Sequence, residues 1–134
     1  MAVDIEIKNG PHFYAGIEEK VVEAVQHARL EEHTLVSSFD HSAVKRVGEL
    51  DSNVALGVLY SARPADGGVC LARAVGAQVV LPHVAYATPD DVERAHDAGL
   101  AYVPWTTSDA GRIRELVEAG VDGVCSNHPD VLAQ

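Results

Sequence analysis

Apolar runs rich in β-branched residues alternate with helical patterns along this sequence, and this alternation constrains the fold more than any other feature. The expected strands cover residues 3–8, 34–39, 54–60, 77–82, 100–107 and 121–126. Helical patterns fill the intervals, over residues 16–32, 41–50, 66–76, 88–99 and 109–120. Strands that recur roughly every 20–30 residues with helices between them run parallel, because a parallel pair needs a long crossover connection.

A parallel sheet is covered on both faces, and two common architectures satisfy this requirement: a doubly wound sheet and a (β/α)8 barrel. No glycine-rich phosphate loop follows the first strand, which weakens the nucleotide-binding version of the doubly wound fold. The 134 residues are enough for one domain and too few for two. Six strands leave such a barrel incomplete, so the pattern predicts a single parallel α/β domain over residues 1–134 and leaves both architectures open.

The charge balance excludes some classes of partner. The chain has 10 basic and 20 acidic residues, a net charge of −10, which argues against a nucleic-acid backbone or an anionic membrane. No apolar run approaches the ~20 residues of a membrane span. The first residues lack the basic and then apolar pattern of a signal peptide. The composition fits a cytoplasmic protein or one from a salt-rich cell interior, and the cytoplasm is the location that we expect.

Polar side chains gather where the expected strands end. Glu6 and Lys8 share one face of the first strand and Ile5 and Ile7 share the other, because successive strand residues point to opposite faces. Two interpretations of the charged pair stay open. It is either an ion pair at a half-solvated strand end, or a site where a carboxylate binds a hard cation and an ammonium holds a phosphate oxygen. The other strand-end residues of this kind are Ser37, Ser38, Asp40, Tyr60, Ser61, His83, Trp105, Thr106, Ser126 and Asn127.

Four segments in order along the chain, residues 6–8 (EIK), 37–40 (SSFD), 105–107 (WTT) and 120–130 (GVDGVCSNHPD), resemble the C-terminal part of glycerophosphodiester phosphodiesterases. The resemblance implies that the chain is the C-terminal part of a (β/α)8 TIM barrel, with about six of its strands. It implies a family activity that hydrolyses glycerophosphodiesters to an alcohol and glycerol 3-phosphate with a divalent cation, Mg²⁺ or Ca²⁺. It also implies that Glu6 binds the metal, that Lys8 contacts the phosphate, and that Trp105 lines the substrate pocket.

The chain departs from that family pattern in ways that bear on activity. The family's catalytic histidines lie in N-terminal segments that this chain lacks. The chain also lacks the glutamate and aspartate that join Glu6 around the metal in the family. None of the seven histidines lies in a matching motif, and His83, which lies near a strand end, is the only one that we single out. Ser126 and Asn127 stand where many relatives have Thr and Asp. We therefore assign no catalytic residue and expect cation binding to be weak or absent in the isolated chain.

Three hypotheses remain open for the function. The chain is a fragment of a family enzyme that is inactive alone, a half-barrel completed by a copy of itself or by a complementary chain, or a non-catalytic α/β binding module. In each case the expected ligand is a small phosphodiester or phosphate, and the open sheet edges favour a homo-oligomer or a partner chain.

Overall fold

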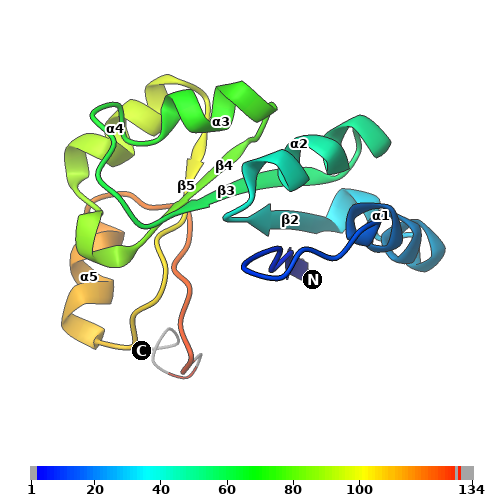
Figure 1. The fold of residues 1–134 in the computed structure, drawn as a ribbon. Coiled ribbons are helices and arrows are strands. Elements are labelled where there is room, and N and C mark those ends of the chain that lie inside the picture. The colour runs from blue at the N-terminus through cyan, green and yellow to red at the C-terminus, as the bar shows by residue number, and fades with distance from the viewer. Residues whose placement is uncertain (1–2, 129, 131–134) are drawn as a thin grey trace. The chain divides into compact units, whose positions relative to one another are not determined.

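The computed structural model describes residues 3–128 and 130, and in this part of the chain strands alternate with helices (Figure 1). Of the residues singled out above, only Pro129 in the last motif lies outside the described part. The strands are β1 (Val3–Glu6), β2 (Thr34–Ser38), β3 (Ala55–Tyr60), β4 (Val79–Pro82) and β5 (Ala101–Tyr102). The α-helices are α1 (Ile17–Ala28), α2 (His41–Leu50), α3 (Val69–Val75), α4 (Pro89–Asp97) and α5 (Ala110–Glu118), and short 3₁₀ turns cover Glu31–His33 and Val84–Tyr86.

The chain divides into two compact units, and the boundary between them passes through α3. The first unit comprises residues 1–59 and 71–78, and the second comprises residues 60–70 and 79–134. None of the helices within residues 3–128 is long and apolar enough to cross a membrane. Each unit is built from parallel strands, as the alternating sequence pattern predicts.

In the first unit, β2 pairs in parallel with β1 on one side and with β3 on the other. The register places Glu6 opposite Ser37, so the last residues of both strands lie at the same end of the sheet. Helix α1 packs against α2, and α2 packs on β2. The core consists of buried aliphatic side chains from these elements: Ile7, Val22, Val25, Val36, Val44, Val47, Leu56 and Val58.

Two helix boundaries in this unit follow from local chemistry. Helix α2 spans residues 41–50 as predicted, because the Asp40 carboxylate accepts hydrogen bonds from the backbone N–H groups of Ser42 and Ala43 at its start. The predicted helix over residues 16–32 is too long. Helix α1 ends at Ala28 because Arg29 adopts left-handed backbone angles, with φ of 56°, and caps the last carbonyl groups.

In the second unit, β4 and β5 pair in parallel, and helices α4 and α5 carry the apolar residues Val92, Ala95, Ile113 and Leu116 into the core. The start of α4 is capped locally, since the Thr88 hydroxyl accepts from the Asp91 N–H and Pro89 occupies the first turn. Helix α4 is rich in charged residues, and one of them, Asp91, is nevertheless only 6% exposed.

The prediction of a sixth strand over residues 121–126 is wrong in the described structure, and the fifth strand is shorter than predicted. The segment 122–125 nevertheless runs beside residues 102–107, because Asp122 N–H donates to the Tyr102 carbonyl and Cys125 N–H to the Pro104 carbonyl. Proline has no N–H to give to a ladder, so the pairing is interrupted at Pro104.

Candidate functional site

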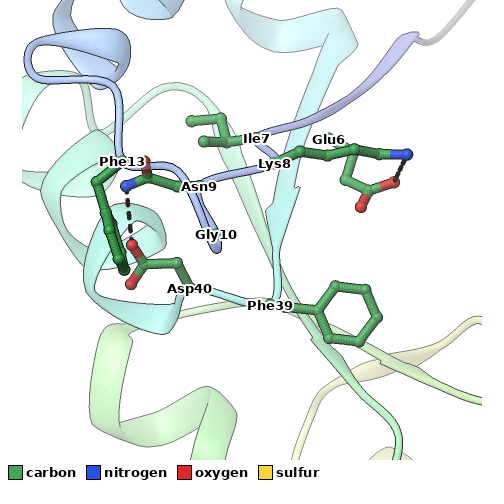
Figure 2. Close-up of a pocket in the computed structure, with 8 residues that line it drawn as sticks. All are labelled: Glu6, Ile7, Lys8, Asn9, Gly10, Phe13, Phe39 and Asp40. Atoms are coloured by element: carbon green, nitrogen blue, oxygen red, sulfur yellow. Dashed lines mark hydrogen bonds and ion pairs between the residues drawn. The ribbon is translucent and has the colours of Figure 1, made fainter.

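The end of β1 carries the charged pair that the sequence predicts. Ile7 is buried in the core at 3% exposure, and alternation turns its neighbours Glu6 and Lys8 to the opposite face. The Lys8 ammonium lies 3.8 Å from a Glu6 carboxylate oxygen (Figure 2). The lysine side chain is 78% exposed and the glutamate side chain 36%. The strand end therefore presents an ion pair that water and ligands can reach.

A cavity of about 500 Å³ lies beside this pair, at the carboxyl ends of β1 and β2 (Figure 2). Its lining combines the polar residues Glu6, Lys8, Asn9 and Asp40 with the aromatic residues Phe13 and Phe39. Both aromatic side chains are exposed. A mixture of apolar wall and a few convergent polar groups is typical of small-molecule sites.

The backbone just before Lys8 is held to β2 through Ile7. The N–H of Ile7 donates to the Ser37 carbonyl at 2.8 Å, and the Ser38 hydroxyl donates to the Ile7 carbonyl at 2.6 Å. The same hydroxyl accepts from the Asp40 N–H at 2.9 Å. Ser38 is fully buried, so its hydroxyl serves the strand ends and does not face a ligand.

Asn9 and Asp40 complete the floor of the cavity. The Asn9 side-chain amide donates to the Asp40 carboxylate at 2.9 Å, across 31 positions of sequence. Sequence reasoning placed Asp40 at a strand end but missed Asn9. The signal for Asp40 was its place just before a helical pattern, which is where capping residues occur. No local sequence pattern predicted a role for Asn9, because its hydrogen-bond partner is distant in the sequence.

A second carboxylate shares the face of Glu6. The Ser37 hydroxyl donates to the Asp4 carboxylate at 2.9 Å. Although Asp4 is exposed as a residue, desolvation of its carboxyl group raises its pKa above the usual range. The hydrogen bond from Ser37 opposes this rise, and the nearby Glu6 charge adds to it. This face of β1 thus carries two acidic groups and one basic group in the order acid, acid, base.

The residues present do not make a complete metal site. No group of three or more His, Cys, Asp or Glu side chains within residues 3–128 and 130 is arranged to hold a metal ion. Mg²⁺ and Ca²⁺ gather several oxygen ligands, and Glu6 offers one carboxylate with an ammonium beside it. A divalent cation at this strand end therefore needs oxygen ligands beyond the single Glu6 carboxylate.

Trp105 belongs to the second unit, where its own contacts fix its ring. The indole N–H donates to the Leu81 carbonyl at 2.9 Å. The His83 ring meets it edge to face, with ring centres 4.8 Å apart. The Nδ1 atom of His83 accepts from the Ala85 N–H at 3.2 Å, so the neutral ring carries its proton on Nε2. The indole is therefore an oriented, partly exposed aromatic surface.

The motif near the C-terminus forms a turn in the second unit. The hydroxyl groups of Ser126 and Ser108 lie 3.1 Å apart, and the His128 N–H donates to the Ser126 hydroxyl at 3.1 Å. These contacts organise the chain after residue 125 and leave Ser126 engaged with protein groups. The described contacts assign no ligand-binding role to Asn127.

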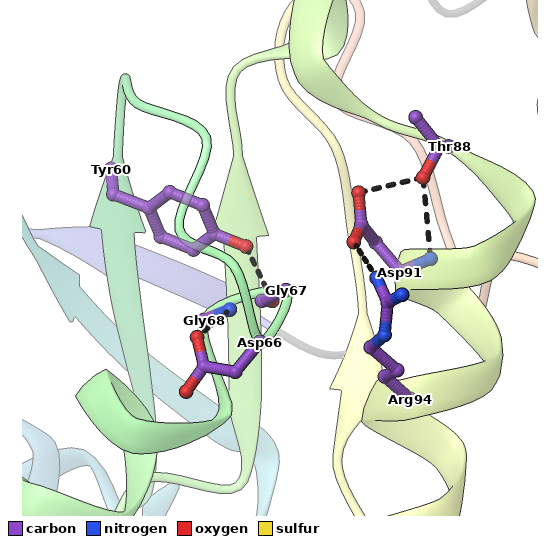
Figure 3. Close-up of polar contacts among 7 residues, drawn as sticks. All are labelled: Tyr60, Asp66, Gly67, Gly68, Thr88, Asp91 and Arg94. Carbon is purple, nitrogen blue, oxygen red and sulfur yellow. Dashed lines mark hydrogen bonds and ion pairs between the residues drawn. The ribbon is translucent and has the colours of Figure 1, made fainter.

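A second polar cluster lies under the loop that follows β3 (Figure 3). The Tyr60 hydroxyl donates to the Gly67 carbonyl at 2.8 Å, and burial raises the pKa of this phenol above its usual value. The buried Asp91 carboxylate accepts from the Thr88 hydroxyl at 2.7 Å and from Arg94 at 2.9 Å. These polar groups find their hydrogen-bond partners within the protein, so the cluster holds the loop and helix α4 in place.

Comparison with known proteins identifies the relatives of this chain. A model of the glycerophosphoryl diester phosphodiesterase family matches residues 3–131. A glycerophosphodiester phosphodiesterase of Caldanaerobacter subterraneus subsp. tengcongensis is 31% identical over 130 residues, which is 97% of this chain and 53% of that protein. The chain thus spans about half the length of the curated relatives it matches.

Solved structures establish the fold. A Galdieria sulphuraria structure named for the same activity superposes with a TM-score of 0.88 at 24% identity, over 99% of this chain and 56% of that one. An Oleispira antarctica phosphodiesterase, in complex with the product sn-glycerol-3-phosphate, superposes with a TM-score of 0.78 at 22% identity, over 100% of this chain and 56% of that one. The prediction of a partial TIM-barrel fold is therefore confirmed.

Proposed function

Because the chain belongs to the glycerophosphoryl diester phosphodiesterase family, we propose that it supplies the phosphate-binding half of a barrel that hydrolyses glycerophosphodiesters. The observation that carries this proposal is the Lys8–Glu6 pair at the edge of a 500 Å³ cavity where two parallel strands end. Active sites of (β/α)8 barrels are built at this end of the strands. A relative of the same fold was solved with sn-glycerol-3-phosphate, which supports a phosphate ester as the ligand.

Lys8 is the phosphate-binding residue in this proposal. Its ammonium is exposed, so it can approach a phosphate oxygen without a large desolvation cost. The backbone before it is tied to β2 through Ile7, which fixes the point from which the side chain extends. A lysine acts on phosphate as a point charge, and it favours the negative charge that builds up during phosphoryl chemistry.

Glu6 contributes one ligand to a divalent cation, Mg²⁺ or Ca²⁺, in the same proposal. Its carboxylate lies on the face of β1 that carries Lys8, and family members generally use such a cation. Because a complete site needs more oxygen ligands than this strand end offers, the cation binds weakly to the chain alone. The remaining ligands come from protein outside the described residues.

Trp105 forms an apolar wall for the substrate in this proposal. Its ring orientation is fixed by Leu81 and His83, which suits a residue that meets a ligand without rearrangement. Trp105 is the only tryptophan of the chain, so fluorescence excited selectively at tryptophan reports on it alone. Saturation with sn-glycerol 3-phosphate should change its emission, and an unchanged spectrum would remove it from the substrate site.

We further propose that the chain needs a second half-barrel, either a copy of itself or a complementary chain, to become an enzyme. Glu6 and Lys8 supply charge, whereas general acid–base groups typically contribute about 10²–10⁴-fold each to such reactions. The alternative function is a non-catalytic module that binds phosphate esters, and the open cavity without a three-ligand metal cluster in residues 3–128 favours it. A single domain over residues 1–134 and a cytoplasmic location remain predictions.

The deciding experiment measures glycerol 3-phosphate release from glycerophosphocholine with Mg²⁺ or Ca²⁺ present. We expect no robust turnover by the chain alone. Adding the separately expressed N-terminal half of the Caldanaerobacter subterraneus relative should restore turnover, and Lys8→Met should abolish this gain. Sedimentation at micromolar concentration shows whether the chain self-associates. Strong metal-dependent turnover by a monomer would overturn the half-barrel proposal, and binding without any rescue would favour the non-catalytic module.

A further inference from the structure

Arg112 in α5 holds a turn that lies 25 to 28 positions away in the sequence. Its Nη2 atom donates to the Ala87 carbonyl at 2.9 Å and to the Val84 carbonyl at 3.2 Å. Its Nη1 atom donates to the Glu115 carboxylate at 2.8 Å, which fixes the guanidinium group in turn. The 3₁₀ turn Val84–Tyr86 is therefore held at its first residue and just after its last by one charged donor, and such hydrogen bonds are stronger than neutral ones.

The same turn surrounds the indole of Trp105. The Ala85 N–H donates to the Nδ1 atom of His83 at 3.2 Å, and the His83 ring meets the indole edge to face. The Tyr86 ring lies on the imidazole as well, with ring centres 5.9 Å apart. The Val84 N–H donates to the Trp105 carbonyl at 2.6 Å. The turn thus reaches the tryptophan by two routes, through the imidazole ring and through the backbone.

We propose that Arg112 is a positioning residue for Trp105. The arginine clamps the turn, the turn fixes the His83 ring, and this ring fixes the indole. None of the hydrogen bonds and ion pairs described for Arg112 reaches Trp105, so the route between the two residues runs through the turn. All of these residues belong to the second unit.

A fixed indole matters for ligand binding because a mobile one has to be immobilised when the ligand arrives. Immobilising one side chain at a binding surface corresponds to a loss of about three- to tenfold in affinity. This consequence rests on the pocket role of Trp105 proposed above, whereas the positioning of the indole does not. The two statements can therefore be tested separately on the same protein.

The test is ¹⁵N relaxation by NMR on the full chain, together with calorimetric binding of sn-glycerol 3-phosphate. The chain has one tryptophan, so one indole N–H resonance reports on Trp105. We expect order parameters of about 0.85 for this group and for the Ala85 N–H in the wild type. Arg112→Met should lower both below about 0.6 and weaken glycerol 3-phosphate binding about three- to tenfold.

The matched control is Arg114→Met, because Arg114 is an exposed arginine of the same helix with no hydrogen bond or ion pair among the described contacts. It should keep the wild-type order parameters and affinity. Arg112→Lys is the conservative variant. Since Nη2 alone makes both carbonyl bonds, an ammonium with three donors can replace it, and this variant should recover most of the lost order.

His83→Asn tests the next step of the route and leaves Arg112 in place. The asparagine oxygen can accept the Ala85 N–H in place of Nδ1, but the variant lacks the imidazole ring. The indole should therefore become mobile while the Ala85 N–H stays ordered. An indole that stays ordered in this variant would show that the His83 ring does not hold it, and the proposed route would fail.

The Arg112→Met results separate the remaining possibilities. Loss of order in both the turn and the indole supports the proposal. An indole as ordered as in Arg114→Met overturns the positioning role, and a mobile indole beside an ordered turn overturns the route through the turn. If the indole becomes mobile and glycerol 3-phosphate affinity does not change, the positioning role stands and the pocket role of Trp105 falls.

Discussion

Replacing Ser38 with alanine should destabilise the first unit far more than an ordinary surface substitution. The Ser38 hydroxyl donates to the Ile7 carbonyl and accepts from the Asp40 N–H, at 2.6 and 2.9 Å. Its side chain is fully buried, so water does not replace these bonds when the hydroxyl is removed. An unsatisfied buried backbone group costs about 1–3 kcal/mol. Because Asp40 is only partly buried, its N–H should cost less than the Ile7 carbonyl, and we expect the free energy of unfolding to fall by about 2–4 kcal/mol in total.

The assay is urea and thermal unfolding of the variant, followed by circular dichroism. For a domain of this size, 1 kcal/mol corresponds to about 4 °C in Tm, so the expected drop is about 8–16 °C. The control is Ser42→Ala, an exposed serine in α2 whose side chain has no hydrogen bond among the described contacts. It should stay within about 0.5 kcal/mol of the wild type. A Ser38→Ala variant as stable as this control would show that the hydroxyl does not hold the two strand ends together.

Three further perturbations probe other contacts. Desolvation raises the pKa of the Asp4 carboxyl group in the folded state. The contribution of this group to the free energy of unfolding is therefore complete below the unfolded-state pKa and is lost as pH rises through the folded-state pKa. Asp4→Asn should be more stable than the wild type at pH 7 and equally stable near pH 3. Gly68→Ala places a methyl group 2.6 Å from the Tyr60 hydroxyl and should lower Tm clearly more than Gly76→Ala, which meets nothing at a similar positive φ. In calorimetry, cation and glycerol 3-phosphate should each strengthen binding of the other, and Glu6→Gln should remove this coupling.

Most of the fold follows from the periodicity of the sequence, because a parallel βα unit leaves a repeated signature. Residues 41–50 form α2 as predicted, since a capping aspartate and an apolar stripe define that helix locally. The errors occur where backbone chemistry interrupts a pattern. Strand β5 ends at Tyr102, and Pro104 has no N–H with which to pair with the segment 122–125. Helix α1 ends just before Arg29, where the sequence has no glycine to mark the helix end. Left-handed backbone angles are uncommon at a non-glycine residue, so the sequence did not predict that α1 ends here.

The candidate site was predictable only in the part that depends on strand alternation. The buried Ile7 makes its two charged neighbours face the other way, and this needs no knowledge of the rest of the chain. The Asn9–Asp40 bond joins residues 31 positions apart, and it exists only because β1 and β2 are parallel and in one register. The burial of Asp91 is similar, because a charged residue at a helix start is normally solvated and only its tertiary surroundings remove it from water.

The ion pair between Lys8 and Glu6 does not exclude the phosphate-binding role that we propose for Lys8, since the pair is weak enough to be exchanged. A contact of 3.8 Å with a lysine side chain that is 78% exposed belongs to the class of surface ion pairs worth about 0–1 kcal/mol. A phosphate ester carries up to two negative charges, and so it competes well for the ammonium against one carboxylate. When the lysine turns to the phosphate, Glu6 loses its positive neighbour and becomes a better ligand for a cation. The exposed pair is therefore the resting state that a site for both ions should adopt, and the loss of coupling in Glu6→Gln tests this exchange directly.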